Sequence, residues 1–423
     1  MDVRRHQALL AIGAAAAGIA AALLYIKTLD AKGLRRNFRR LLFLWANDSR
    51  SLVTIDDSLL SAALQHQRRH ARVQELFIYP VKSCHATPMK ECVLAPYGPE
   101  GDRMFVLGQA KSADGSYSQI TQRLRPALAT LTCAVATDGS SIRFTSASGA
   151  SIQVRLAHVT GDRVRPAKLK LHTKVVDCAI ATIDKAEDMK LDEWIKEHFP
   201  ARTSVVGVHR LFRLSNMPGQ VSEMAALPLL GKVLHPRDLV SFPDLAPFLL
   251  TNLSSLASLN EHLPTGVPMD RFRPNLVLEG LPAWAEDRIE EVEVLRENSS
   301  EGLSFITCLR KFQDCTRCVM TTIDQQTGAA GFLQDLKTAE PLSTLKRVRP
   351  GQELSALLGG LLPVEKGGSG GGRSPVFGAY FGYSSGQHPH FGSMPTIRTG
   401  DVVRVTKWVD CRGRVHQVKK SAC

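Results

Sequence analysis

Several motifs that would identify a common class of protein are missing from this chain of 423 residues. It has no GxGxxG fingerprint after a strand-like segment, no Walker A loop and no HExxH pair. Zinc-finger spacing, RNA-binding aromatic motifs and internal repeats are also missing. We therefore do not expect a nicotinamide or flavin domain within the chain, and the electrons for any redox chemistry would come from another protein.

Cysteine is scattered, with nine residues of which only Cys315 and Cys318 form a close pair. A secreted protein held together by disulfides would have a denser and more regular set. We therefore expect a reduced protein in which most cysteines are small buried hydrophobic side chains. The 44% hydrophobic and 22% charged residues are ordinary for a globular protein. The length allows two domains.

The net charge of +13 indicates an anionic partner, and much of the excess lies near the N-terminus. Residues 8–26 form an uncharged apolar run that, as a helix, would extend about 28 Å, close to the thickness of a hydrocarbon core. We expect a single-pass membrane anchor in residues 1–27, with a cleaved signal or transit peptide, or a buried core helix, as alternatives. Because more basic residues follow the run than precede it, the body should face the cytosol.

Residues 28–71 are expected to be a basic amphipathic segment followed by a connector. Apolar residues recur at helical spacing from Leu34 to Trp45, with arginines elsewhere on the helical wheel. This pattern is typical of a helix on an anionic membrane surface, or of one docked on the protein body. Residues 46–70 are predicted to be a polar connector.

From Val73 onward, short apolar runs separated by Gly, Pro and Asp predict a fold of the α+β class that is mainly β. The predicted strands are Glu75–Val81, Met104–Gly108, Leu131–Ala136, Ser141–Thr145, Ile152–Leu156, Val277–Leu278, Val292–Leu295 and Val402–Val405. Helices are predicted at Asp188–Phe199, with Trp194 facing inward, and at Ser254–His262, with Ser254 as the cap. The Gly-rich run 366–373 should be a flexible insert within a domain.

Cys318 is the first candidate for chemistry. The neighbouring guanidinium of Arg317 favours a thiolate, and thiolates prefer soft or borderline metals. Residues 319–324, which follow, are predicted to form a hydroxyl-rich strand. The Cys315–Cys318 pair has three other interpretations, namely half of a zinc site, a thioredoxin-like redox pair or two inert buried cysteines. No second CxxC or HxxxH completes a zinc site.

Other segments offer groups suited to an anionic ligand. Lys82 and Ser83 follow a strand end, and Arg103 lies at a turn that enters a strand. Arg271 and Arg273 are expected to lie on one face of an extended segment, where both guanidiniums could bind an anion.

Two uncharged residues could complete such a site. Asn275 could bind the edge of a heterocycle, and Tyr380 could donate a hydrogen bond into a pocket. All of these candidates also have structural interpretations, as turn, ion-pair, strand-capping or core residues.

Together these segments resemble the MOSC-domain molybdenum proteins, and among them the mitochondrial amidoxime-reducing components. The matching segments, which keep the family's order, are Ile78–Cys84, Gly101–Phe105, Thr121–Arg123, Phe272–Asn275, Trp284–Asp287, Arg317–Cys318, Thr321–Asp324, Lys337–Leu345 and Phe377–Phe381. The resemblance covers roughly residues 73–410. It implies a MOSC-type β-barrel fold, with a MOSC N-terminal β-barrel region at 72–220 and a MOSC domain at 221–418.

The resemblance further implies a molybdopterin cofactor whose molybdenum is bound by Cys318, which makes Cys318 both metal ligand and catalytic residue. The residues implied to line the cofactor pocket are Lys82, Ser83, Arg103, Asp244, Leu245, Ala246, Arg273, Asn275, Arg317 and Tyr380. Leu245 and Ala246 stand where the family usually has small hydroxyl residues, so any contact from these two must come from the backbone.

The activity implied is a two-electron reduction of amidoximes, hydroxylamines and N-oxides. Electrons would pass from NADH through NADH-cytochrome b5 reductase and cytochrome b5, and the anchor would lie in the mitochondrial outer membrane. No nucleic acid or pyridoxal phosphate is expected. Two alternatives remain open, a membrane-tethered carrier of the molybdenum cofactor and a sulfur-handling MOSC module without reductase turnover.

Overall fold

The computed structural model describes most of the chain after residue 56. The described residues are 57–65, 71–110, 116–157, 165–171, 174–200, 208–214, 242, 246–298, 302–350, 375–384, 387, 389, 393–410 and 414–418. All described helices and strands belong to one compact unit. The predicted anchor, the amphipathic segment after it, Asp244, Leu245 and the Gly-rich insert lie outside these residues. Within the described part, no helix is long and apolar enough to cross a membrane.

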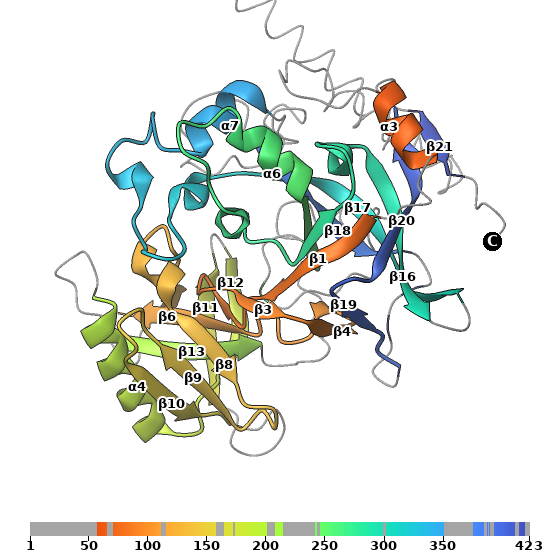
Figure 1. Cartoon of the computed structure of the whole chain (residues 1–423). Helices are drawn as coiled ribbons and strands as arrows, with labels where there is room; N and C mark the ends of the chain where they lie inside the picture. Colours follow the sequence, from red (N-terminus) through yellow and green to blue (C-terminus); the bar gives the residue numbers. More distant parts are fainter. Residues whose placement is uncertain are drawn as a thin grey trace, which may run out of the picture. The chain divides into compact units, whose positions relative to one another are not determined.

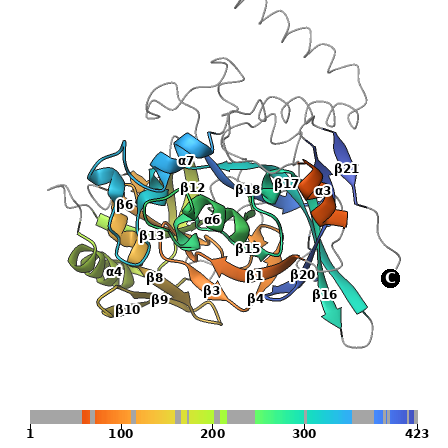
Figure 2. The ribbon, with the colours of Figure 1, turned by 45° about the horizontal axis from the view of Figure 1, so that its top comes forward.

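A nine-stranded sheet carries most of the second half of the chain (Figures 1 and 2). Its strands, in spatial order, are β21 (Val415–Gln417), β20 (Val402–Val409), β16 (Ile289–Asn298), β17 (Gly302–Thr316), β18 (Val376–Tyr383), β14 (Phe248–Asn252), β15 (Leu276–Glu279), β1 (Ala71–Ile78) and β3 (Thr87–Met89). Strand β1 also pairs with β20, so the strands from β20 to β1 close into a barrel. A strand from the start of the described chain therefore completes a barrel built from its end.

Aromatic side chains fill the core of this barrel. Phe248, Phe272, Phe377, Phe381 and Tyr383 are fully buried. The rings of Phe272 and Phe377 stack with centroids 3.9 Å apart, which fixes the segment before β15 against β18. Removing one such ring would cost about 3–5 kcal/mol of unfolding free energy, because the cavity cannot collapse completely.

A six-stranded sheet forms a second, smaller barrel. Its strands, in spatial order, are β13 (Val208–Leu214), β12 (Lys174–Ile180), β11 (Arg165–Leu171), β7 (Tyr117–Gln119), β6 (Phe105–Ala110) and β2 (Val81–Lys82). β13 also pairs with β6, which closes five of the strands. Gly108 in β6 is required at this closure, because an added Cβ would lie 2.5 Å from the ring of Phe212.

The remaining elements are short and cover these barrels. Two three-stranded sheets have the orders β10 (Ser151–Arg155), β9 (Ser141–Thr145), β8 (Thr132–Val135) and β19 (Thr396–Arg398), β4 (Glu91–Ala95), β5 (Gly98–Pro99). The helices are α3 (Asp57–Gln65), α4 (Lys185–His198), α6 (Leu253–Asn260) and α7 (Leu342–Val348), with 3-10 turns η1 (Pro126–Thr130), η2 (Met269–Phe272), η3 (Ala285–Asp287), η4 (Val319–Thr322) and η5 (Gly331–Leu333). The prediction of a mainly β fold is confirmed.

Both predicted helices occur, with one correction. In α4 the side chain of Asp184 caps the N-terminus, and Trp194 faces the interior as predicted. In α6 the cap is Asn252, whose side-chain oxygen accepts a hydrogen bond from the Ser254 backbone N–H at 3.2 Å. The prediction of Ser254 as the cap is wrong because the helix begins one residue earlier, and Asn is at least as good a cap as Ser.

Three local predictions are also wrong. Residues 46–70 are not only a polar connector, because α3 buries Leu60 and Leu64 in the barrel core. Residues 319–324 begin with the 3-10 turn η4 in place of a strand. The segment around Phe272 is the 3-10 turn η2 and is not extended. Arg271 and Arg273 therefore do not lie on one face of a strand, as was predicted.

Candidate functional site

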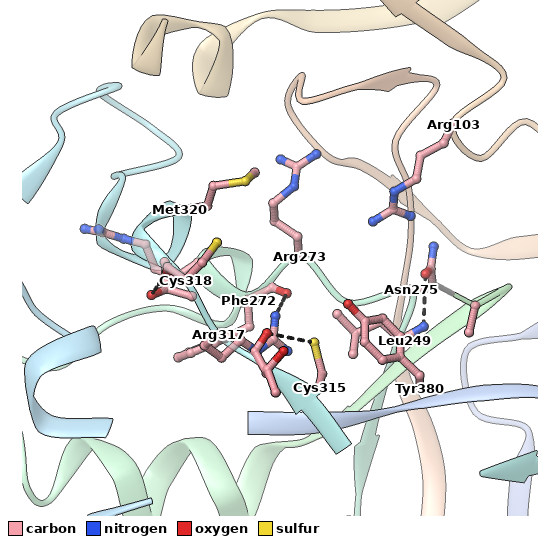
Figure 3. A pocket seen from close by; sticks show the side chains of 14 residues that line it. Arg103, Leu249, Phe272, Arg273, Asn275, Cys315, Arg317, Cys318, Met320 and Tyr380 are labelled. Atoms are coloured by element: carbon pink, nitrogen blue, oxygen red, sulfur yellow. Dashed lines mark hydrogen bonds between the residues drawn. The ribbon is translucent and has the colours of Figure 1, made fainter. Parts of the chain in front are cut away.

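A pocket between the two barrels encloses about 610 Å³, part of it open to solvent (Figure 3). Its lining residues come from both halves of the chain and include four arginines and two cysteines. They are Arg103, Ala246, Leu249, Arg271, Phe272, Arg273, Asn275, Cys315, Thr316, Arg317, Cys318, Met320, Thr321 and Tyr380. Seven of the eleven residues predicted for the site are in this set.

Cys318 lies at the edge of the pocket with its side chain partly exposed. It immediately precedes η4, and its carbonyl accepts hydrogen bonds from the backbone and the hydroxyl of Thr321. Its thiol accepts a hydrogen bond from Nη2 of Arg123, 3.1 Å away. This is the arrangement expected for a sulfur that can reach a ligand in the pocket while its backbone is held by the turn.

Arg317 does not turn toward the neighbouring thiol. Its guanidinium donates to the carbonyl of Phe377 at 2.5 and 2.8 Å and to the carbonyl of Phe272 at 2.9 Å. Gly378 allows this approach, because a Cβ there would lie 2.8 Å from the carbonyl oxygen of Leu250 and 3.4 Å from the guanidinium. The expectation that Arg317 is the cation beside the sulfur is therefore wrong, and Arg123 has that position.

Arg103 and Arg273 lie on the ring of Tyr79, with guanidinium carbons 4.6 and 4.2 Å from its centroid. Burial raises the pKa of the Tyr79 hydroxyl above its usual range, so this ring stays neutral. Its hydroxyl donates to the carbonyl of Pro274. Tyr79 thereby holds two cations from the two halves of the chain within one pocket, and in Figure 3 Arg273 stands between Cys318 and Arg103.

Backbone strain is concentrated at the predicted site residues. Within the described ranges, the non-glycine residues with positive φ are Ser83 (69°), Arg103 (49°), Arg273 (54°) and Trp284 (66°). Such conformations cost on the order of 1–3 kcal/mol each and collect at ligand sites. Three of these four residues were predicted as cofactor contacts, which indicates that the fold holds their side chains in set directions.

Lys82 and Ser83 are buried next to this region without being among the lining residues. Nζ of Lys82 donates to the carbonyl of Phe242 at 2.8 Å. Their contact with a cofactor stays a prediction, as does that of Asp244 and Leu245, which the structure does not describe.

Asn275 and Tyr380 both line the pocket, but their side chains have different surroundings. The amide of Asn275 is used within the barrel, where it accepts from the Leu249 N–H and donates to the carbonyl of Phe77, both at 3.2 Å. It therefore positions strands beside the pocket, and contact of its remaining N–H or lone pair with a heterocycle stays a prediction. Tyr380, in β18, is half-buried in the pocket wall.

Sequence reasoning gave no role to Arg123, Met320 or Gln325. Gln325 is buried, and its side-chain oxygen accepts from Arg273 Nη1 at 3.1 Å, while Arg273 also donates to the carbonyl of Cys84. For Arg123 the sequence did contain a signal, the motif Thr121–Arg123, which was matched to the family but could not be placed in space.

Arg271 forms an ion pair with Asp324 at 2.8 Å, so its charge is balanced locally.

The pocket suits an anionic ligand that carries a soft metal. None of its described lining residues is Asp or Glu, whereas four are arginines, two of which, Arg103 and Arg271, have the carboxylate partners Asp102 and Asp324. Among the described residues, no group of three or more His, Cys, Asp or Glu could hold a metal ion by itself. A metal at Cys318 would thus need further ligands from a cofactor, and a dithiolene cofactor with a phosphate tail matches both the sulfur and the arginines.

Cys315 is a poor partner for Cys318 in a protein-only metal or redox site. Its side chain is 1% exposed and lies at 3.7 Å from the carbonyl oxygen of Thr316. The described cysteines are all free thiols, and all but Cys318 are buried, which confirms the expectation for those seven residues.

Two family patterns match the chain. The MOSC N-terminal beta barrel domain matches residues 70–199, and the MOSC domain matches residues 238–404. The barrel that carries Cys318 lies mainly in the second of these ranges, while Arg103 and Arg123 come from the first.

Named relatives align along most of the chain. Mitochondrial amidoxime-reducing component 1 of Homo sapiens is 26% identical over 314 residues, 73% of this chain and 77% of that protein. The protein of the same name from Mus musculus is 29% identical over 346 residues, 79% and 84% of the two chains. Mitochondrial amidoxime reducing component 2 of Homo sapiens is 28% identical over 331 residues, 73% and 86%. With both domain patterns present in tandem, the chain belongs to the MOSC-domain proteins and is similar to the mitochondrial amidoxime-reducing components.

Proposed function

We propose that this protein is a molybdenum-cofactor-dependent reductase of N-oxygenated compounds. The observation that carries the proposal is the partly exposed thiol of Cys318 in a pocket whose described lining residues include four arginines and no carboxylate. The names of its relatives, which refer to amidoxime reduction, support the same activity. When bound, the cofactor supplies a two-electron centre at which an N–O bond is cleaved.

Each half of the chain has a part in holding the cofactor. Cys318 would bind the metal, and Arg103, Arg273 and Arg317 would bind the anionic groups of the pterin and its phosphate. Because Arg103 and Arg273 are held on Tyr79, they are placed before the ligand arrives, and less entropy is lost on binding.

The open side of the pocket would receive the substrate. Met320, Leu249 and Ala246 give it apolar walls for the organic part of an amidoxime or hydroxylamine. Reduction of R–NHOH consumes two electrons and two protons and releases R–NH2 and water. The hydroxyl of Tyr380 lies on the pocket wall, where it would donate a hydrogen bond to the leaving oxygen (Figure 3).

The electrons would come from NADH through NADH-cytochrome b5 reductase and cytochrome b5, since the chain has no nicotinamide fingerprint of its own. The relatives named as mitochondrial support a mitochondrial location. The apolar run 8–26 would anchor the protein in the outer mitochondrial membrane, with the body facing the cytosol.

The test uses the full chain made in a host that supplies the pterin. We expect equimolar molybdenum by elemental analysis, pterin fluorescence after oxidation, and NADH-dependent reduction of benzamidoxime when cytochrome b5 and its reductase are added. Molybdenum without turnover would favour the carrier alternative. A protein with neither molybdenum nor pterin would overturn the proposal.

A further inference from the structure

We infer that Arg123, from the N-terminal β-barrel region, is a positioning residue for Cys318, which holds the sulfur toward the metal and sets how easily the metal is reduced. This inference rests on the proposed function. Nη2 of Arg123 lies 3.1 Å from Sγ of Cys318, whereas the neighbouring Arg317 donates to the carbonyls of Phe272 and Phe377. The cation at the sulfur is therefore supplied from nearly 200 residues away in the sequence.

The turn that carries Arg123 is held on both sides by buried residues. Gln122 is 0% exposed and Arg125 is 5% exposed, while Arg123 and Leu124 between them are exposed. Arg125 donates to the carbonyl of Phe199 and to the side chain of Gln109. Backbone N–H groups of Leu124 and Arg125 both donate to the carbonyl of Thr121. Such a turn presents the Arg123 side chain from a fixed backbone.

The same turn is fastened to the segment that follows Cys318. The side-chain amides of Gln122 and Gln325 are bonded reciprocally, at 3.1 and 3.4 Å, and both residues are buried. Ala129 packs with Ile323 and Ala330 in a small apolar cluster. At Gly328, a Cβ would lie 3.0 Å from Cα of Ala127. These contacts between the two segments therefore fix the position of Arg123 relative to Cys318.

A guanidinium at this distance has two physical consequences. It fixes the direction of the sulfur, because Sγ accepts a charge-assisted hydrogen bond from the guanidinium. It also withdraws charge from a metal-bound sulfur, which favours the reduced state of the metal. Partners of this kind typically change metal affinity or activity by about 10–100-fold.

The first test needs no cofactor. Full-length protein from a host unable to make the pterin is alkylated at pH 7 with neutral iodoacetamide and, separately, with anionic iodoacetate, and modification of the Cys318 peptide is followed by mass spectrometry. A cation 3.1 Å from Sγ attracts only the anionic reagent, so we expect the ratio of the iodoacetate rate to the iodoacetamide rate to fall about fivefold in R123M, with R123K close to the wild type. The control is R143M, which removes the same charge from an exposed arginine of β9.

The second test uses protein loaded with cofactor. In R123M the midpoint potential of the molybdenum, followed by electron paramagnetic resonance during a redox titration, should move to a more negative value. A tenfold change in the one-electron equilibrium corresponds to about 59 mV. R123K should restore part of the shift, and R143M should leave the potential unchanged.

The outcomes separate the two proposals. Equal ratios of the two alkylation rates and equal potentials in R123M and the wild type would overturn the role of Arg123, whatever the activity. A wild type without molybdenum and pterin would overturn the proposed function and the effect on the metal. In that case the ratio of the two alkylation rates alone would decide whether the Arg123 guanidinium lies at the Cys318 sulfur.

Discussion

Arg317 and Arg349 show two uses of an arginine in the same barrel. Arg349, which is 3% exposed, forms an ion pair with Asp287 and lies 4.3 Å from the ring centre of Trp284. Arg317, in the pocket, donates to two neutral carbonyl oxygens. A carboxylate balances the first charge, whereas carbonyl partners leave the second available to an anion. The difference holds for this pair of residues, because Arg103 and Arg271 in the pocket also have carboxylate partners, Asp102 and Asp324.

The largest expected effect is at the sulfur beside these pocket arginines. C318A should lower benzamidoxime turnover at least about 10³-fold and remove bound molybdenum, because the metal loses its protein ligand. The melting temperature of the cofactor-free protein should stay near that of the cofactor-free wild type, since the Cys318 side chain is partly exposed. C308A, which changes a buried cysteine of β17, is the control and should keep activity. Turnover by C318A with molybdenum still bound would refute the assignment.

The second-largest effect is expected at Arg349, whose charge is balanced by Asp287. R349M should lower the free energy of unfolding by about 3–5 kcal/mol, because the carboxylate of Asp287 would stay buried without its cation. Chemical denaturation measures this loss. R398M is the control, since its ion pair with Glu91 is about half exposed on both sides and should contribute less than about 1 kcal/mol. An equal loss of unfolding free energy in R349M and R398M would show that the buried ion pair of Arg349 stabilises the fold no more than an exposed one.

Glu286, next to Asp287, gives the third prediction. Burial, with a further effect from the charge of Asp287, raises its pKa from 4.5 to about 7. Between these values the unfolded chain has lost a proton that the folded protein keeps, so the stability of the protein should fall as pH rises from about 4.5 to 7. The cost above pH 7 is on the order of 3 kcal/mol.

E286Q removes this titration and should keep the hydrogen bond from Ser255. Its unfolding free energy relative to the wild type should therefore rise between pH 5 and pH 8, measured by urea denaturation at each pH. A difference independent of pH would show that Glu286 is not held protonated at neutral pH.

The smallest expected effect is at Arg317 itself. R317M should weaken retention of the cofactor by about 10–100-fold while the unfolding free energy of the cofactor-free protein falls by less than in R349M. Molybdenum content after dialysis against a chelator measures the first quantity. If R317M were as unstable as R349M and kept its cofactor, the distinction between the two arginines would be wrong.

Much of the fold was predictable because its signals are local. The predicted strands occur except the one at 319–324, and α4 was placed within a few residues, since alternation and helical periodicity depend on near neighbours. The helix α3 was missed because its apolar face is only Leu60 and Leu64 with their neighbours, within a polar stretch. The turn η4 was taken for a strand because its hydroxyl residues fit both structures.

The candidate site was predictable in its residues more than in its geometry. Arg103, Arg273, Arg317 and Cys318 line one pocket, but sequence adjacency wrongly paired Arg317 with the sulfur. The contact of Arg123 with Cys318 depends on two segments meeting in space, which no local pattern contains. Motif order from the family resemblance identified the segments and could not supply their contacts.

The closure of the larger barrel by β1 has a practical consequence for anyone who shortens this protein. Residues 71–78 lie far from the MOSC range 238–404, yet their backbone covers the sides of both β15 and β20. A fragment that begins after residue 78 would leave β15 unpaired on the side of β1 and β20 unpaired at Val402 and Val403, and unpaired strand edges are templates for aggregation. Expression trials that treat the second domain as independent should therefore give insoluble material, and soluble fragments should retain this N-terminal strand.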